Sequence, residues 1–123
     1  MEMQISRKYQ RLDCFWYGWH IEAQISKDNQ KWVEIEVPSI SAGGLMFKVP
    51  DNLYAEGDTV WLNVYVNPKM LYFPGMSFQT KAVVKGTREL PGGEAVGVDF
   101  ETIQILLDDI INSIAVKYGE LVE

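Results

Sequence analysis

Cysteine, histidine and arginine are scarce in this chain, and each shortage excludes a class of site. Cys14 is the single cysteine and His20 the single histidine among 123 residues, so neither an internal disulfide nor a cysteine-based zinc site is possible. A thiol nucleophile needs a histidine to activate it, and none lies beside Cys14 in the sequence. Glycine-rich phosphate loops and nucleophile elbows are also missing. We therefore expect a protein that is not an enzyme and that uses no metal or cofactor.

Positive charge is in short supply as well. The chain has 11 Lys and Arg against 17 Asp and Glu, a formal net charge of -6, which argues against a general binder of DNA, RNA or anionic membranes. The N-terminal residues are charged and polar ahead of an aromatic run, unlike a signal peptide. No apolar run approaches the length of a membrane span. The expected compartment is the cytoplasm.

Hydrophobic periodicity predicts a small, mainly β domain. With 47% hydrophobic residues in a chain of 123, one domain with its own core is expected. Polar and apolar residues alternate over several short runs that are separated by turn-forming residues, which favours an antiparallel barrel or sandwich of six strands. The predicted strands cover residues 20–25, 32–37, 45–49, 59–66, 76–85 and 94–100.

The pattern changes near residue 101. Apolar residues from Ile103 to Tyr118 recur at steps of three and four, which predicts one face of a C-terminal helix over about residues 101–118. Asp99 or Thr102 is the candidate cap at its start. The apolar face either packs against the barrel or forms a seam between two copies of the chain, so a homodimer through this helix is a second interpretation.

A run of small residues, Ser39-Ile40-Ser41-Ala42-Gly43-Gly44, separates two of the predicted strands. The serines and glycines leave the backbone nearly bare, so another molecule can approach it closely. The serine hydroxyls can also donate and accept hydrogen bonds. Two interpretations are open at this point: a turn that cradles a polar or anionic ligand, or a bulge that bends a barrel strand.

Residues 1–12 are predicted to form an N-terminal arm, mobile when nothing is bound, that precedes a single domain over residues 13–123. The arm contains Arg7, Lys8 and Arg11, and Arg88 is the only other arginine of the chain. A guanidinium group is permanently charged and forked, so it binds phosphate bidentately and pairs with the O6 and N7 edge of guanine. These basic residues are either a solvated tail or, together with the Ser/Gly run, an anion-binding site.

Taken together, these features resemble the PilZ domain family, bacterial receptors for cyclic diguanylate (cyclic di-GMP). Two family motifs are involved, Arg-x-x-x-Arg on the N-terminal arm and (Asp/Asn)-x-Ser-x-x-Gly on the barrel rim. The run from Arg7 to Arg11 is a full match to the first motif. The second is matched at Ser41 and Gly44, but position 39 is a serine. Residues 97–100, Gly-Val-Asp-Phe, are also similar to the Gly-x-x-Phe that closes the last strand in the family.

The resemblance implies a split six-stranded antiparallel β-barrel with a C-terminal α-helix. It also implies cyclic di-GMP as the ligand, no further cofactor, and an unidentified downstream protein as the partner. The implied ligand-binding residues are Arg7, Lys8, Arg11, Ser39, Ser41, Gly43 and Gly44.

Ser39 is the departure that bears on function. The acid or amide that the family has there accepts hydrogen bonds from guanine N–H groups or orients the arm's arginine, whereas serine keeps one acceptor but loses charge and reach. We therefore expect binding weaker by ~1–2 kcal/mol. The alternative is a PilZ-like adaptor that no longer binds the nucleotide and works through protein contacts.

Overall fold

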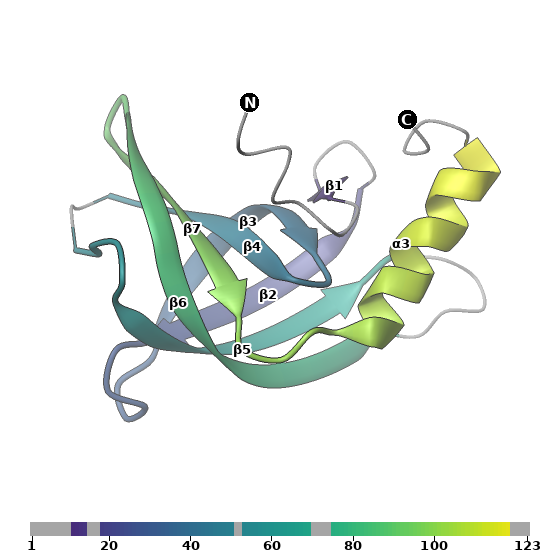
Figure 1. Cartoon of the computed structure of the whole chain (residues 1–123). Helices are drawn as coiled ribbons and strands as arrows, with labels where there is room; N and C mark the ends of the chain where they lie inside the picture. The colour runs from purple at the N-terminus through teal and green to yellow at the C-terminus, as the bar shows by residue number, and fades with distance from the viewer. Residues whose placement is uncertain (1–10, 15–17, 51–52, 70–74, 119–123) are drawn as a thin grey trace.

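Six antiparallel strands close into a barrel, and a C-terminal helix lies beside one end of it (Figure 1). The computed structural model describes residues 11–14, 18–50, 53–69 and 75–118, and in the helix it describes side chains as far as Ser113. The elements are β1 Leu12–Asp13, β2 His20–Ser26, β3 Val33–Ser41, β4 Gly44–Val49, β5 Thr59–Asn67, β6 Met76–Leu90, β7 Gly93–Phe100 and α3 Ile105–Tyr118. This confirms the predicted fold class, a six-stranded antiparallel barrel followed by a helix.

The strand order explains how the barrel closes. The strands follow the order β3-β2-β5-β6-β7-β4, and β4 returns to pair with β3. The short strand β1 pairs with Ser39 and Ile40 of β3, and β4 pairs with the same two residues, so β1 and β4 lie on opposite edges of β3. Because β2 pairs with β3 only around Val33–Ile35, β1 occupies the part of that edge which β2 leaves open.

Alternating burial forms the core. In β5 the side chains of Val60, Leu62, Val64 and Val66 are almost completely buried, while the residues between them are half-buried on the outer face. Phe47 of β4 is fully buried in the same core. This is the period-two pattern from which the strand was predicted.

The helix packs its apolar face onto the barrel. Three residues of this face, Leu107, Ile110 and Ile111, are buried and belong to the same core cluster as the strands. For this part of the apolar face, the expectation that it packs against the barrel is confirmed. By contrast, Ile105 and Leu106 at the start of α3 are exposed. The homodimer seam stays a prediction.

The helix begins later than the sequence predicts, at Ile105 instead of about residue 101. The preceding segment is held in another path by tertiary hydrogen bonds, since Glu101 N donates to Lys81 O at 2.7 Å and Gln104 N donates to Ala42 O at 2.9 Å. The first bond of α3 runs from Asp108 N to Gln104 O at 3.1 Å. Gln104 therefore precedes the first turn, and neither Asp99 nor Thr102 is the cap.

Two strands are longer than predicted. β3 continues through Ser41 instead of ending at Val37, because β1 and β4 pair with its small polar end. β6 continues to Leu90 because β7 pairs with it along that whole length. A register shift between Glu36 and Ser39 marks a bulge that includes Pro38, which has no N–H to donate to a ladder.

Candidate functional site

The register of β1 brings the end of the predicted arm to the Ser/Gly run. Leu12 pairs with Ile40 and Asp13 pairs with Ser39, and both Leu12 and Ile40 are fully buried. Continued by one position, this antiparallel register places Arg11 beside Ser41, and Arg11 is exposed. Figure 1 shows β1 alongside β3 at the barrel end that faces α3. Leu12, assigned to the arm from sequence, is thus fixed in the sheet, while Arg7 and Lys8 lie outside the described residues.

The Ser/Gly run is a tight hairpin with an internal brace. Ser41 pairs with Gly44, so the turn between β3 and β4, here called the rim turn, consists of Ala42 and Gly43. The Ser41 hydroxyl accepts a hydrogen bond from Gly43 N at 3.3 Å and donates one to Gly44 O at 3.4 Å. Ser41 is only 9% exposed. Its hydroxyl therefore holds the shape of the rim turn.

The backbone of the rim turn is less bare than the sequence suggests. Gly43 O accepts a hydrogen bond from Phe100 N at 2.8 Å, and Ala42 O accepts the bond from Gln104 N. Ala42 is completely buried. Because these carbonyls are already satisfied by β7 and by the segment before α3, they belong to the scaffold of the site.

Gly44 is needed for close strand packing. A Cβ added there would lie 2.1 Å from the carbonyl oxygen of Val98 on β7. Among the described glycines, positive φ occurs at Gly18, Gly57 and Gly92, so the rim turn does not depend on a left-handed glycine. The space beside Gly44, and not its φ, requires glycine.

An open strip crosses the outer face next to the rim turn. Ser39 pairs with Met46 of β4, and Met46 pairs with Gly97 of β7. The flanking residues Leu45 and Phe47 are buried, so Met46, which is half-buried, points to the outside. A Cβ added at Gly97 would meet no described atom within 4 Å. Few side chains project from this strip, so a flat ligand can lie on it.

Charges of both signs border this strip. Asp13 is exposed. It is the register partner of Ser39, and the two residues lie on the outer side of the barrel. On β7, Asp99 pairs with Gly44 and its carboxylate lies 3.8 Å from Lys85 Nζ, with both side chains well exposed. An exposed pair of this kind contributes little to stability, about 0–1 kcal/mol. Its significance here is that the outer face next to the rim turn is polar.

The surroundings of Cys14 and His20 give no sign of a catalytic or metal site among the described residues. Burial, and secondarily the charge of Asp13, raises the pKa of the Cys14 thiol to about 12, so it stays protonated at neutral pH and is a poor nucleophile. His20 Nε2 lies 2.8 Å from an exposed Glu22 carboxylate oxygen. Within the described part of the chain, no group of three or more His, Cys, Asp or Glu side chains could hold a metal ion. Nor does any described helix have the length and hydropathy needed to cross a bilayer.

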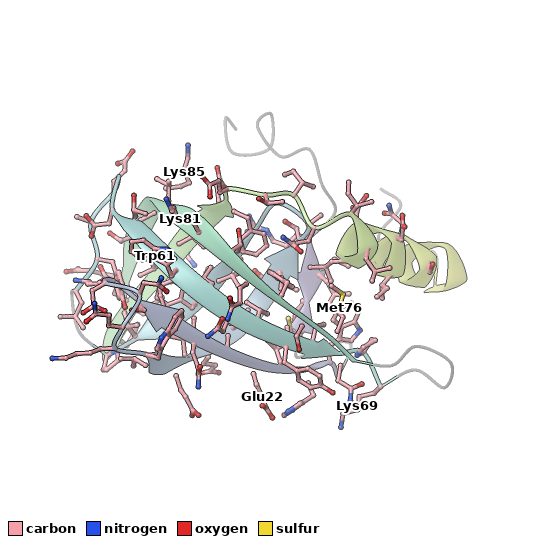
Figure 2. All side chains as sticks on the ribbon, turned by 90° about the horizontal axis from the view of Figure 1, so that it is seen from below. Glu22, Trp61, Lys69, Met76, Lys81 and Lys85 are labelled. Carbon is pink, nitrogen blue, oxygen red and sulfur yellow. The ribbon has the colours of Figure 1, made fainter. Side chains whose placement is uncertain are left out.

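A hollow of about 930 Å³ is lined by β2, β5, β6 and the start of β3, and it includes none of the predicted site residues. Figure 2 looks onto these strands and labels Glu22 and Trp61 on them. Lys81 lies over the Trp61 ring, with Nζ 5.8 Å from its centroid. The Asn63 side-chain oxygen in the hollow is buried without a hydrogen-bond partner. The described motif residues lie elsewhere, with Arg11 directly before β1 and the others in β3, the rim turn and β4.

A family profile for the PilZ domain matches residues 5–115. The chain belongs to the PilZ domain family. The match extends from the arm into α3, and it confirms the family that the sequence motifs indicated. A search of curated proteins finds no match.

Solved PilZ-type structures have the same fold. The inhibitor of motility MotI/DgrA of Bacillus subtilis is 20% identical to this chain, with a TM-score of 0.72, and the match covers 90% of this chain and 52% of MotI/DgrA. Escherichia coli YcgR in complex with c-di-GMP is 18% identical with a TM-score of 0.64, covering 94% and 48%. K. pneumonia MrkH, also a c-di-GMP complex, is 11% identical with a TM-score of 0.63, covering 92% and 54%. The chain thus spans about half the length of these proteins, and identities this low establish the fold alone.

Sequence reasoning missed Asp13 as a member of this site. Its position two residues after Arg11 was visible, but nothing in the sequence fixed which residue of β3 it would face. Met46 and Gly97 were also overlooked, because both lie inside strands of ordinary appearance. Of the aromatic run, Trp19 is buried in the core, and residues 15–17 lie outside the described part.

Proposed function

We propose that this chain is a non-catalytic receptor for cyclic di-GMP that binds the nucleotide on the strip beside the rim turn, with the N-terminal arm closing over it. The observation that carries the proposal is the register of β1, which puts Arg11 next to Ser41 although thirty positions separate them in sequence. The c-di-GMP complexes of YcgR and MrkH share this fold and support the same ligand.

The chemistry of the arm suits such a ligand. Cyclic di-GMP carries two phosphates and two guanines, and in this proposal Arg7 and Arg11 take phosphates and guanine edges while Lys8 adds positive charge. Ser39 lies beside the ligand, and Ser41, Gly43 and Gly44 keep the rim turn in shape. Each charge-assisted hydrogen bond contributes ~1.5–3 kcal/mol. After subtraction of ~2–5 kcal/mol for ordering the arm, the expected affinity is around micromolar.

A route from the site to the helix follows from backbone contacts. Ala42 O in the rim turn accepts from Gln104 N, and Gln104 O accepts from Asp108 N in the first turn of α3. Ile105 and Leu106 next to it are 65% and 57% exposed. We infer that arm closure at the rim turn changes the surface presented here to a downstream protein in the cytoplasm.

Isothermal titration calorimetry with cyclic di-GMP tests the proposal. Wild type should bind, and Arg11→Ala should bind at least about tenfold more weakly because a charge-assisted contact is lost. The matched control is Arg88→Ala, which removes an exposed arginine of β6 and should leave affinity within about twofold of wild type. Wild type without binding heat, or Arg11→Ala indistinguishable from wild type, would refute the receptor.

The second candidate is a PilZ-like adaptor, and the serine at position 39 together with the exposed start of α3 favours it. An adaptor would show the same thermal midpoint with and without cyclic di-GMP. A receptor gains ~2.7 kcal/mol of stability at a ligand concentration a hundredfold over its dissociation constant. Size-exclusion chromatography with light scattering on the same sample would test the predicted homodimer through α3.

A further inference from the structure

Asp13 and Ser39 face each other across the β1–β3 pair. They are register partners, and their neighbours Leu12 and Ile40 are also partners and fully buried. Because side chains alternate along a strand, Asp13 and Ser39 point together to the outside of the barrel. Directly opposed residues of an antiparallel pair have Cβ atoms ~4.5–5.5 Å apart. The Asp13 carboxylate thus lies next to position 39, where the family motif has an aspartate or asparagine.

The two side chains complement each other chemically. Asp13 is exposed and Ser39 is half-buried, so both side chains can be reached from the same outer side of the barrel. A serine hydroxyl donates one hydrogen bond, and an ionised carboxylate accepts through two oxygens. A hydrogen bond from Ser39 uses only one of the roughly four acceptor sites of a carboxylate, so both oxygens keep an acceptor site for a ligand on the strip formed by Met46 and Gly97.

We propose that Asp13 supplies from β1 the carboxylate that residue 39 lacks, and that it reads the guanine base of the ligand. The inference rests on the proposed function. Guanine presents two neighbouring donors, N1–H and the N2 amino group, which match the two acceptor oxygens of a carboxylate. Adenine has an acceptor at N1 and would face the carboxylate unfavourably. Asp13 would thus set the choice of base, while the arm's arginines bind mainly charge.

Because Arg11 is close to Asp13, the experiment has to distinguish two roles for Asp13: positioning Arg11 and binding the base. Arg11 lies two positions before Asp13, and side chains at that spacing share one side of a strand. If Asp13 only positioned Arg11, its removal would weaken every cyclic dinucleotide by the same factor. If Asp13 reads the base, its removal must lower the preference for guanine.

The experiment is calorimetry of the full chain with cyclic di-GMP and with its inosine analogue, which lacks the N2 amino group. Wild type should prefer the guanine form by about tenfold, the size of one charge-assisted hydrogen bond. Asp13→Asn should reduce this preference to about threefold or less, because an amide offers one acceptor oxygen in place of two. The matched control is Glu34→Gln, an exposed acid on β3, the strand with which β1 pairs, and it should keep the wild-type preference.

A variant that exchanges the two side chains gives a second, independent measurement. The double variant Asp13→Ser with Ser39→Asp keeps one carboxylate and one hydroxyl on the same pair and should recover most of the guanine preference. An unchanged preference in Asp13→Asn, equal weakening of both ligands, or tighter binding through release of Arg11 would each overturn the assignment of Asp13. Failure of wild type to bind either ligand would instead end the proposed function, and this inference with it.

Discussion

Gly44→Ala is the substitution whose effect the structure defines most sharply. The new methyl carbon would lie 2.1 Å from Val98 O, 3.2 Å from Val98 C and 3.4 Å from Asp99 Cα. All three atoms belong to the backbone of β7, so no side-chain rotation can relieve the contact. The strands have to move apart by about 1 Å to reach the ~3.3 Å of a close carbon–oxygen contact.

The cost of that movement is concentrated at the rim turn. Gly44 pairs with Asp99, and the adjacent bond from Phe100 N to Gly43 O is 2.8 Å long. Overpacking costs ~1–3 kcal/mol, and a weakened backbone hydrogen bond adds ~0.5–1.5 kcal/mol. We expect a loss of about 2–4 kcal/mol, a large part of the ~5–15 kcal/mol that stabilises a typical domain.

Urea denaturation followed by tryptophan fluorescence measures this loss. The matched control is Gly97→Ala on the same β4–β7 ladder, where the added carbon meets no described atom within 4 Å. It should change the unfolding free energy by less than about 1 kcal/mol. If the unfolding free energy of Gly44→Ala lies within ~0.5 kcal/mol of the wild-type value, the steric explanation for glycine at position 44 is wrong. A direct contact with the ligand then becomes the better explanation.

Two further predictions concern Leu12 and Cys14, which are buried in and directly after β1. Leu12 is fully buried, so Leu12→Ala should lower the unfolding free energy measured by urea denaturation by ~2–5 kcal/mol. The control is Leu53→Ala, at a side chain that is 52% exposed, which should lower it by less than about 1 kcal/mol. Similar losses in the two variants would contradict the role of Leu12 in holding β1 against the barrel. Burial raises the pKa of Cys14 from 9.0 to about 12, so the folded state keeps a proton that the unfolded chain releases above pH 9, and stability falls as pH rises from there toward 12. Between pH 8 and 10 wild type should lose about 1.4 kcal/mol more than Cys14→Ala, and parallel pH profiles of the two proteins would refute this assignment.

The sequence predicted elements well where local pattern and tertiary environment agree. β5 runs over Thr59–Asn67 against a prediction of 59–66, because its inward residues are all aliphatic and its outward residues are all larger or polar. The end of β3 was missed because Ser39 and Ser41 carry no apolar alternation. Strand structure there depends on pairing with β1 and β4, which are distant in sequence. The late start of α3 has the same origin, since Gln104 N is bonded to Ala42 O.

The location of the candidate site could be predicted, but not its internal arrangement. Motif spacing indicated that the arm and the Ser/Gly run belong together, and the β1 register places their described residues side by side. The opposition of Asp13 and Ser39 was beyond reach, because a slip of one residue in a two-residue strand would turn Asp13 into the core. The requirement for Gly44 also depends on a backbone approach from β7 that no local pattern encodes.

The residues of the candidate site therefore fall into two groups that experiments can separate. Gly44 and Ser41 serve the rim turn, the first through the approach of Val98 O and the second through hydrogen bonds within the turn, so their substitution should lower stability and affinity together. Asp13 on the outer side of β1 and Arg11 directly before β1 are exposed, so their substitution should lower affinity while leaving the unfolding free energy within ~0.5 kcal/mol of wild type. Since both carbonyls of the rim turn already accept a hydrogen bond within the fold, we expect the proposed ligand to be held mainly by side chains. Affinity and choice of base should accordingly depend more on the residues of β1 and the arm than on the glycines by which the motif is defined.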